Sequence, residues 1–513
     1  MVTREELAKT NFDRSLSDTR FIDPNAGSLR TGQGKADAQS NTAQTVGSIC
    51  EKGIVWVLVV VVVGTALASG AVEPWSVAIF ELLVISIIIM WGVRALSERR
   101  VFLDVPVAAL PMGLFVLMGV AQSLALRDEG GRTRSLSLDV EATRLAALTV
   151  FFLLVCFLAA ANFLAVRKRM RFVVRSLVIY GLVMAVFALA QHFSQAGRTY
   201  WLRPMSEGIS WFGPFVNHAH YAGYMSLLIP LPIALTANGI VRKEERLLFG
   251  FAAAVMGLSL IVSLSRGGMI AMVAELMFLL IAGSRWMRRV LGPRDDGDRQ
   301  LPSERGQFKR IAALGGISLA IAVGVMMLGL EPVANRIARG NGSESNGGES
   351  LYESRGWIWR DSVRVFEAHP LTGVGMGAFE TAFPMYSKSN GSLLVSQSHN
   401  DYLQVLADCG IAGGILAIWF IGAIWSAVRR GLCAQDPFRR SLVLGSGASI
   451  FGMLVHSAFD FNLQVPSTAL LFLLMCAIAY AAGNGSRWTQ KSRAEGERRR
   501  GRMSEGPAWG QTG

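Results

Sequence analysis

Cysteine is scarce in this sequence, and its spacing excludes the usual cysteine-based sites. Five of the 513 residues are cysteine, and no two have the two-residue spacing of a metal-binding or redox pair. Cys156 and Cys476 lie within apolar stretches, where cysteine usually acts as a small hydrophobic residue. The sequence therefore predicts neither a disulfide framework nor a metal site.

The sequence also lacks the amphipathic periods, broken by turns, that a soluble chain of this length would show. Apolar residues make up 51% of the chain and gather in blocks that are apolar on every side, such as residues 53–71 with five consecutive valines. About 20 such residues cross a bilayer as a helix, and a helix satisfies its own backbone hydrogen bonds in lipid. We therefore expect an all-α, polytopic transmembrane helix bundle.

The apolar blocks predict about twelve membrane spans. They cover residues 53–72, 74–93, 105–126, 145–166, 173–192, 216–238, 247–264, 267–284, 311–330, 410–428, 441–458 and 466–483. The resulting domains are a disordered tail (1–52), spans one to nine (53–330), a large polar loop (331–409), spans ten to twelve (410–484) and a basic tail (485–513). An even number of spans places both termini on the same side.

The net charge of +13 suggests nucleic-acid binding, but its distribution argues against that partner. Of the 50 lysines and arginines, 37 lie in the two tails and in alternate loops. Basic residues favour cytoplasmic loops. Both termini are therefore predicted to be cytoplasmic and residues 331–409 extracytoplasmic.

The large loop is too long to be a mere connection. Its Gly- and Ser-rich start, residues 340–348, predicts a mobile segment. Residues 352–367 have the pattern of an amphipathic helix ended at Pro370. A Gly-rich turn at 373–377 follows, and residues 399–408 predict a second short helix that leads into the tenth span.

Several polar residues on the outer side are candidates for chemistry. Arg266, at the tip of a tight hairpin of spans, is either a snorkelling arginine or a ligand for a lipid phosphate. Arg355, Arg360 and Arg364 form either a solvated helix face or an anion site. His399, at a helix start, is either merely exposed or a general base.

Two further groups leave the function open at this point. His218 and His220, at the mouth of the sixth span, have an i, i+2 spacing that does not suit metal binding, and we expect them to line an outer cavity. Glu81 and Glu275 lie within spans, where carboxylates often mark ion pathways, so they support a transporter or flippase as the alternative. Against that alternative, the chain shows no pair of related halves.

Taken together, three segments resemble the O-antigen ligase and polymerase superfamily. They are residues 354–360, 370–379 and 399–403, and in the last one His399-Asn400 is followed by nine residues and then by Gly410, two residues and Gly413, as in the ligase motif. Residues 215–218 and 265–267 are also similar to family segments. The resemblance covers about residues 210–425.

The resemblance implies an enzyme of the bacterial inner membrane that transfers a glycan from undecaprenyl diphosphate to an acceptor hydroxyl, without metal, nucleotide or other cofactor. The expected partners are this lipid-linked donor, a lipid A-core, growing polysaccharide or protein acceptor, and membrane lipids. The implied catalytic residues are His399 as base and Arg266 on the diphosphate. The implied substrate-binding residues are Arg203, Arg355, Arg360, Asn400 and His218.

Overall fold

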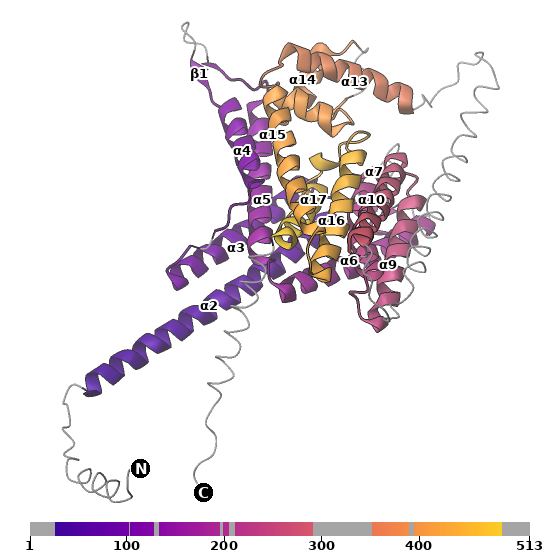
Figure 1. The fold of residues 1–513 in the computed structure, drawn as a ribbon. Helices are drawn as coiled ribbons and strands as arrows, with labels where there is room; N and C mark the ends of the chain where they lie inside the picture. The colour runs from indigo at the N-terminus through magenta and orange to yellow at the C-terminus, as the bar shows by residue number, and fades with distance from the viewer. Residues whose placement is uncertain are drawn as a thin grey trace, which may run out of the picture.

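The computed structural model describes residues 26–101, 103–127, 133–194, 198–204, 211–290, 351–388 and 394–484 (Figure 1). Within these ranges the regular structure is mostly helix. The described strands form two ribbons of two-residue strands, β1 (Leu126–Arg127) with β2 (Thr133–Arg134) and β3 (Arg198–Thr199) with β4 (Arg203–Pro204). The predicted all-α helix bundle is confirmed.

The helices follow the predicted spans and loop helices closely. In chain order they are α2 (Ala26–Leu67), α3 (Pro74–Glu98), α4 (Ala109–Gln122), α5 (Val140–Phe163), α6 (Arg167–Phe193), α7 (His218–Leu228), α8 (Pro230–Ala237), α9 (Lys243–Val262), α10 (Arg266–Val290), α13 (Leu351–Ala368), α14 (Phe379–Tyr386), α15 (Asp401–Leu432), α16 (Pro437–His456), the 3-10 turn η1 (Asn462–Gln464) and α17 (Pro466–Gly483).

Among the described helices, eight are long and apolar enough to cross a membrane. The total of twelve spans stays a prediction, and the ninth span (311–330) and the Gly-rich loop start (340–348) lie outside the described residues. The single span expected at 216–238 is two helices, α7 and α8, because Pro230 and Pro232 lack the N–H groups that a continuous helix needs.

The N-terminal tail differs from the prediction as well. Helix α2 begins at Ala26, within the segment expected to be a tail, and continues to Leu67. No proline occurs between residues 25 and 73, so nothing blocks the helical hydrogen bonds where the apolar block ends. Sequence polarity therefore marks where the apolar part of α2 begins, whereas the helix itself begins earlier.

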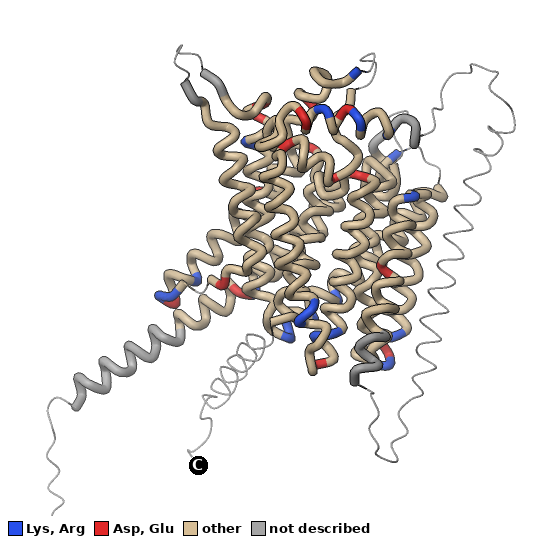
Figure 2. The backbone as a smooth tube through the Cα atoms, turned by 45° about the horizontal axis from the view of Figure 1, so that its top comes forward, with Lys and Arg blue, Asp and Glu red and all other residues tan. Residues whose placement is uncertain are grey.

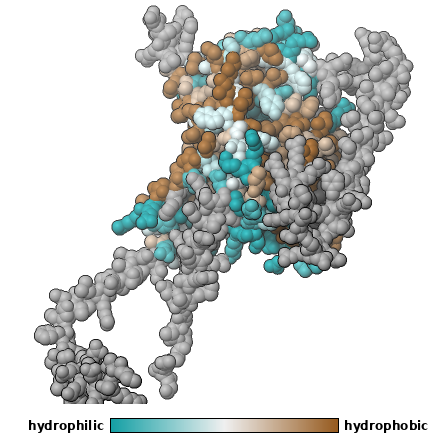
Figure 3. All heavy atoms as spheres, in the orientation of Figure 1, coloured by the Kyte–Doolittle hydropathy of each residue, from teal (hydrophilic) through white to brown (hydrophobic). Residues whose placement is uncertain are grey.

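Helix α17 lies at the centre of the bundle. It packs against α2, α5, α7, α15 and α16, and its apolar side chains are almost all buried. The outer helices differ, since α3 exposes Leu82 and Ile89, which are 65% and 59% accessible. Figure 3 shows apolar side chains gathered over the upper part of the visible face of the bundle, with hydrophilic side chains below them. Exposed apolar surface of this kind is stable in contact with lipid.

The described part of the large loop, residues 351–388 and 394–409, forms a loop subdomain at one end of the bundle (Figure 1). Helix α13 confirms the predicted amphipathic helix, and α13 and α14 share a small core with Val365, Val374, Phe379 and Phe383. Gln122 of α4 anchors this subdomain to the bundle: its Nε2 donates to the carbonyl of Thr372 at 2.7 Å.

The end of the bundle opposite the loop subdomain carries a concentration of basic residues, as Figure 2 shows. Glu51 of α2 pairs there with Arg94 of α3 at 2.9 Å and also with Arg169 of α6. The α15–α16 connection at this end follows Arg429 and Arg430 and precedes Arg439 and Arg440. The two ends of the bundle therefore differ in charge in the sense that the sequence predicts.

Candidate functional site

The site is built around the α16–α17 connection, residues Ser457–Val465, next to the loop subdomain. The start of α15 is bound to this connection through its backbone and side chains. The N–H of Asp401 donates to the carbonyl of Ser457 at 2.9 Å, and the N–H of Leu463 donates to Asp401 Oδ2 at 3.2 Å. Two segments that are about 60 residues apart in sequence therefore form one rigid surface.

Asn400 sets the start of α15. Its Oδ1 accepts hydrogen bonds from the N–H groups of Tyr402 and Leu403, as an N-cap residue does. Its Nδ2 donates to the carbonyl of Ala458 at 3.0 Å. Asn400 was predicted to bind substrate, but both its amide oxygen and its amide nitrogen form hydrogen bonds within the protein. These bonds fix the position of the preceding residue, His399.

His399 lies immediately before this cap in a left-handed conformation, with φ of 51°. Its Nδ1 lies 3.5 Å from Oδ1 of Asp460, and its ring meets that of Phe461 edge-on, with 4.9 Å between centroids. The side chain is 30% accessible, whereas that of Asp460 is 3% accessible. The arrangement leaves a half-buried imidazole whose Nδ1 faces a buried carboxylate.

The charge state of Asp460 is fixed by its neighbours. Burial by itself raises the pKa of this carboxyl, but the adjacent His399, His220, His456 and Arg355 outweigh burial and hold the pKa well below its ordinary value. Asp460 is therefore a carboxylate at neutral pH. Its Oδ1 also accepts a hydrogen bond from the N–H of Phe461 at 2.9 Å, which fixes the direction of the carboxylate.

Arg266 lies close to this cluster at the first residue of α10. Two small residues after it allow the approach: a Cβ at Gly267 would lie 2.8 Å from the ring of His456, and one at Gly268 would lie 2.5 Å from Cβ of Ala222 in α7. The Arg266 side chain itself is exposed. Since Asp460 donates its N–H to the carbonyl of His456, Arg266 and His399 flank the same short segment.

Of the other predicted arginines, one joins the site and the others lie elsewhere. Arg355 joins the site, because its Nη1 donates to the carbonyl of Phe459 at 2.8 Å. Arg360 lies farther along α13 and is exposed, and Arg364 pairs with Asp361 on the same helix, as the solvated-face interpretation expects. Arg203 belongs to β4.

The histidines of α7 have separate positions. His218 is the first residue of that helix. His220 is buried, and its ring meets the ring of Phe461 edge-on at 4.7 Å. His220 and His399 therefore contact the same phenylalanine. Within the described residues, no group of three or more His, Cys, Asp and Glu side chains has the geometry to hold a metal ion.

The backbone conformation explains the first glycine of the His-Asn motif, Gly410. Gly410 kinks α15 with φ of 60° and ψ of −161°, a region that is almost restricted to glycine. A Cβ there would lie 2.5 Å from the carbonyl carbon of Leu371. Beyond the kink, Ile411 donates its N–H to Pro370 at 2.8 Å. The kink therefore joins the start of α15 to the Gly-rich turn.

The part of the sequence that forms most of this site is similar to a known protein family. Residues 251–418 match the family model described as O-antigen ligase. This match supports the resemblance to the O-antigen ligase and polymerase superfamily. The matched segment contains Arg266, Arg355, Arg360, His399 and Asn400, and it excludes Arg203, His218 and Asp460. No curated protein matches the chain. The match and the eight described membrane-spanning helices together support a multi-pass bacterial membrane protein of glycan transfer in polysaccharide biosynthesis.

Sequence reasoning missed the members of the site that follow α16. His456 and Asp460 were taken as the end of a span and a short outer connection. One signal was available, since Asp460 is the sole charged residue between residues 441 and 483. A charge there costs free energy unless it is paired, but the sequence gives no sign that its partner comes from residue 399.

Proposed function

We propose that this protein transfers a glycan from undecaprenyl diphosphate to an acceptor hydroxyl on the extracytoplasmic face of the inner membrane. The observation that carries the proposal is the Asp460–His399 pair beside Arg266 and Arg355. It combines a base whose orientation is held with cations at the end of a membrane bundle. The two requirements of the reaction are a proton acceptor and positive charge for a departing diphosphate.

In the proposed reaction His399 is the general base. Its Nδ1 faces Asp460, so Nε2 is the nitrogen that takes the proton of the acceptor hydroxyl. The hydroxyl oxygen attacks the anomeric carbon, and the bond from that carbon to the diphosphate oxygen breaks, with the electron pair leaving on the diphosphate. Direct displacement inverts the anomeric configuration. Asp460 stabilises the imidazolium that forms and holds the ring in place.

Arg266 is proposed to bind the departing diphosphate. A guanidinium matches phosphate oxygens with two parallel hydrogen bonds. Cations held in place before the reaction stabilise negative charge as it develops in the transition state. Its exposure at the first turn of α10 supports this role, as does the proximity of Arg355 to the same connection. Arg203, Arg360 and His218 remain proposed substrate contacts, and Asn400 is proposed to position His399.

The test uses the purified full chain in lipid nanodiscs with undecaprenyl-diphosphate glycan and separate acceptors: lipid A-core, polysaccharide and protein. The parent should glycosylate one acceptor class. His399→Ala should lower kcat by about 10²–10⁴-fold, and Arg266→Ala should lower kcat/KM at least as strongly as any other arginine substitution. Arg99→Ala, at the other end of the bundle, is the matched control. Equal transfer by parent and both site variants overturns the assignment.

The alternative of a transporter makes a different prediction with the same material. It rests on Glu81 and on Glu275, which is buried in α10. A transporter moves labelled lipid-linked glycan across vesicles without glycosylating an acceptor. Lipid movement that persists in His399→Ala, together with no transfer by the parent, would favour this alternative.

A further inference from the structure

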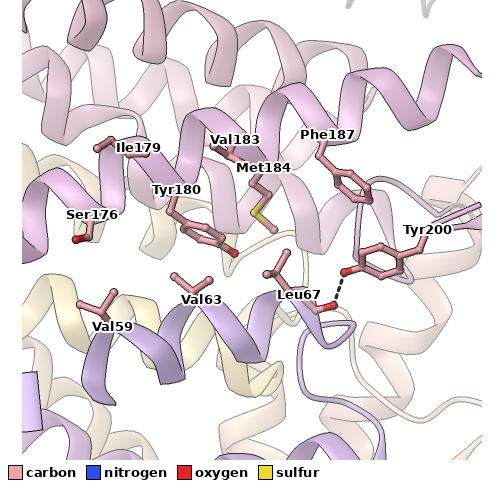
Figure 4. A pocket seen from close by; sticks show the side chains of 10 residues that line it. All are labelled: Val59, Val63, Leu67, Ser176, Ile179, Tyr180, Val183, Met184, Phe187 and Tyr200. Atoms are coloured by element: carbon pink, nitrogen blue, oxygen red, sulfur yellow. Dashed lines mark hydrogen bonds between the residues drawn. The ribbon is translucent and has the colours of Figure 1, made fainter. Parts of the chain in front are cut away.

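An apolar groove lies between α2 and α6 on the membrane-facing side of the bundle (Figure 4). Its volume is about 540 Å³. Val59, Val63 and Leu67 contribute one wall at successive turns of α2. The opposite wall consists of α6 residues Ser176, Ile179, Tyr180, Val183, Met184 and Phe187. The lining is therefore almost wholly apolar along about 12 Å, given the helical rise of 1.5 Å per residue.

The groove is open to the side and closed at one end. Ile179 and Val183 are 52% and 60% accessible, so the long open side of the groove faces the surrounding lipid. Tyr200, in the turn between β3 and β4, covers the end nearer the loop subdomain: its hydroxyl donates to the carbonyl of Leu67, and its ring stacks on that of Phe187 at 5.2 Å. Figure 4 shows this closing contact.

The closed end has the chemistry of a membrane surface. Trp201 follows Tyr200 in the same turn and is 44% accessible, and paired tyrosine and tryptophan are typical of the lipid head-group level. Arg198 and Arg203 belong to the two strands that this turn connects, and Arg198 is exposed. An apolar groove that ends beside a turn with an exposed arginine, Arg198, on its first strand matches a lipid with a phosphate-bearing head.

One helix separates this groove from the candidate site. On one side α7 contacts the groove walls, since Tyr224 donates its hydroxyl to the carbonyl of Val62 at 3.1 Å and its ring meets that of Tyr180 edge-on. On its other side α7 approaches the site, where a Cβ at Gly223 would lie 2.7 Å from the side chain of Asn462. The groove and the site are therefore about 10 Å apart, the diameter of a helix.

We infer that the groove binds the isoprenoid chain of the lipid-diphosphate donor, with the chain entering from the open side and the diphosphate lying beyond the end nearer the loop subdomain. This inference rests on the proposed function. The bilayer and the groove are equally apolar surroundings for the isoprenoid chain, so moving the chain into the groove gives little affinity. Packing against the groove walls is therefore the source of selectivity. The benefit is orientation: a chain held along α2 and α6 places the anomeric carbon near His399 before the reaction.

The test fills the groove with one side chain. Val63→Trp places an indole among the lining residues, and Val60→Trp is its control on the same helix, because Val60 is 47% accessible and does not line the groove. Each variant receives two donors with the same glycan and diphosphate, one with a long isoprenoid chain and one with a chain of two isoprene units. Folding is checked by the melting temperature in nanodiscs.

The parent and Val60→Trp should prefer the long-chain donor, with a KM about tenfold lower than for the short-chain donor. Val63→Trp should lose most of that preference. A diazirine probe on the isoprenoid chain should label α2 and α6 peptides, and excess undecaprenyl phosphate should compete. Equal chain preference in both tryptophan variants, or labelling displaced by phosphatidylglycerol alone, overturns the inference. Absence of transfer from either donor in the parent overturns the proposed function instead, and the labelling still tests the groove.

Discussion

At the scale of single residues, the chemistry depends on a carboxylate that is kept charged where a buried carboxyl is usually neutral. Asp460 is 2% accessible, and its cationic and imidazole neighbours come from α7, α13, α16 and the segment just before α15. A buried charge of this kind is maintained only when it is paired. The pairing explains why His399 has a fixed direction although its own side chain is half-buried.

Asp460→Asn should lower kcat by about 10- to 100-fold with little change in KM, because the base remains while its orientation and its charged partner are lost. Kinetics of glycan transfer at saturating donor measure the effect. Glu367→Gln, an exposed acid on α13, is the control and should behave as the parent. A large rise in KM with unchanged kcat would place Asp460 in substrate binding instead.

The lowered pKa of Asp460 also predicts how stability depends on pH. A carboxyl whose pKa falls on folding contributes stability that is fully present above its unfolded pKa of about 3.9 and is lost as the pH falls toward the folded pKa. The difference in melting temperature between the parent and Asp460→Asn should therefore persist without decline from pH 7 to pH 5. It should shrink below about pH 4. A difference that already declines between pH 7 and pH 5 contradicts the lowered pKa.

At the scale of elements, the loop subdomain and α15 are joined by backbone positions that need glycine. Gly373, Gly375 and Gly377 all have positive φ values, and a Cβ at Gly375 would lie 2.2 Å from Oγ of Ser137. Gly410 provides the kink that turns α15 from the site into the bundle. The start of α15 thus takes its direction from turns rather than from its own sequence.

Gly410→Ala should destabilise the protein by about 1–3 kcal/mol, because alanine is strained at this φ and ψ and its Cβ meets the backbone of Leu371. Gly422→Ala is the matched control on the same helix, where a Cβ meets nothing within 4 Å. It should be neutral or slightly stabilising. Melting temperatures in the same detergent decide the comparison, and equal values for the two variants would show that the kink tolerates a side chain.

At the scale of the whole molecule, orientation follows from the charge difference between the two ends of the bundle. The proposal places the loop subdomain outside and both termini inside, in agreement with the excess of basic residues in the opposite connections. The native cysteines provide a test, since Cys433 is exposed at the far end of α15 and the other four are buried.

A membrane-impermeant maleimide should label Glu367→Cys in intact spheroplasts. It should label Cys433 only after the membrane is permeabilised. Cys433→Ser should abolish the labelling that appears after permeabilisation, and it is the control that assigns this labelling to Cys433. Labelling of Cys433 in intact spheroplasts, with none at residue 367, would reverse the orientation and remove the site from the extracytoplasmic face.

The sequence by itself determined the properties that depend on composition and local pattern. Apolar blocks specified the helices because lipid allows few other structures, and the segments around Arg266 and His399 indicated the family. The amphipathic helix at 352–367 and the turn at 373–377 were also predictable, since helix periodicity and glycine are local signals.

Tertiary structure alone decided which residues meet. Asp460 faces His399 across 61 positions of sequence, and α7 separates the groove from the site through Tyr224 on one side and Gly223 on the other. No local pattern encodes these contacts, because they depend on how the separate apolar helices pack around α17. The second hydrogen bond of the Asn400 side chain likewise goes to a partner, the carbonyl of Ala458, that comes from a distant connection.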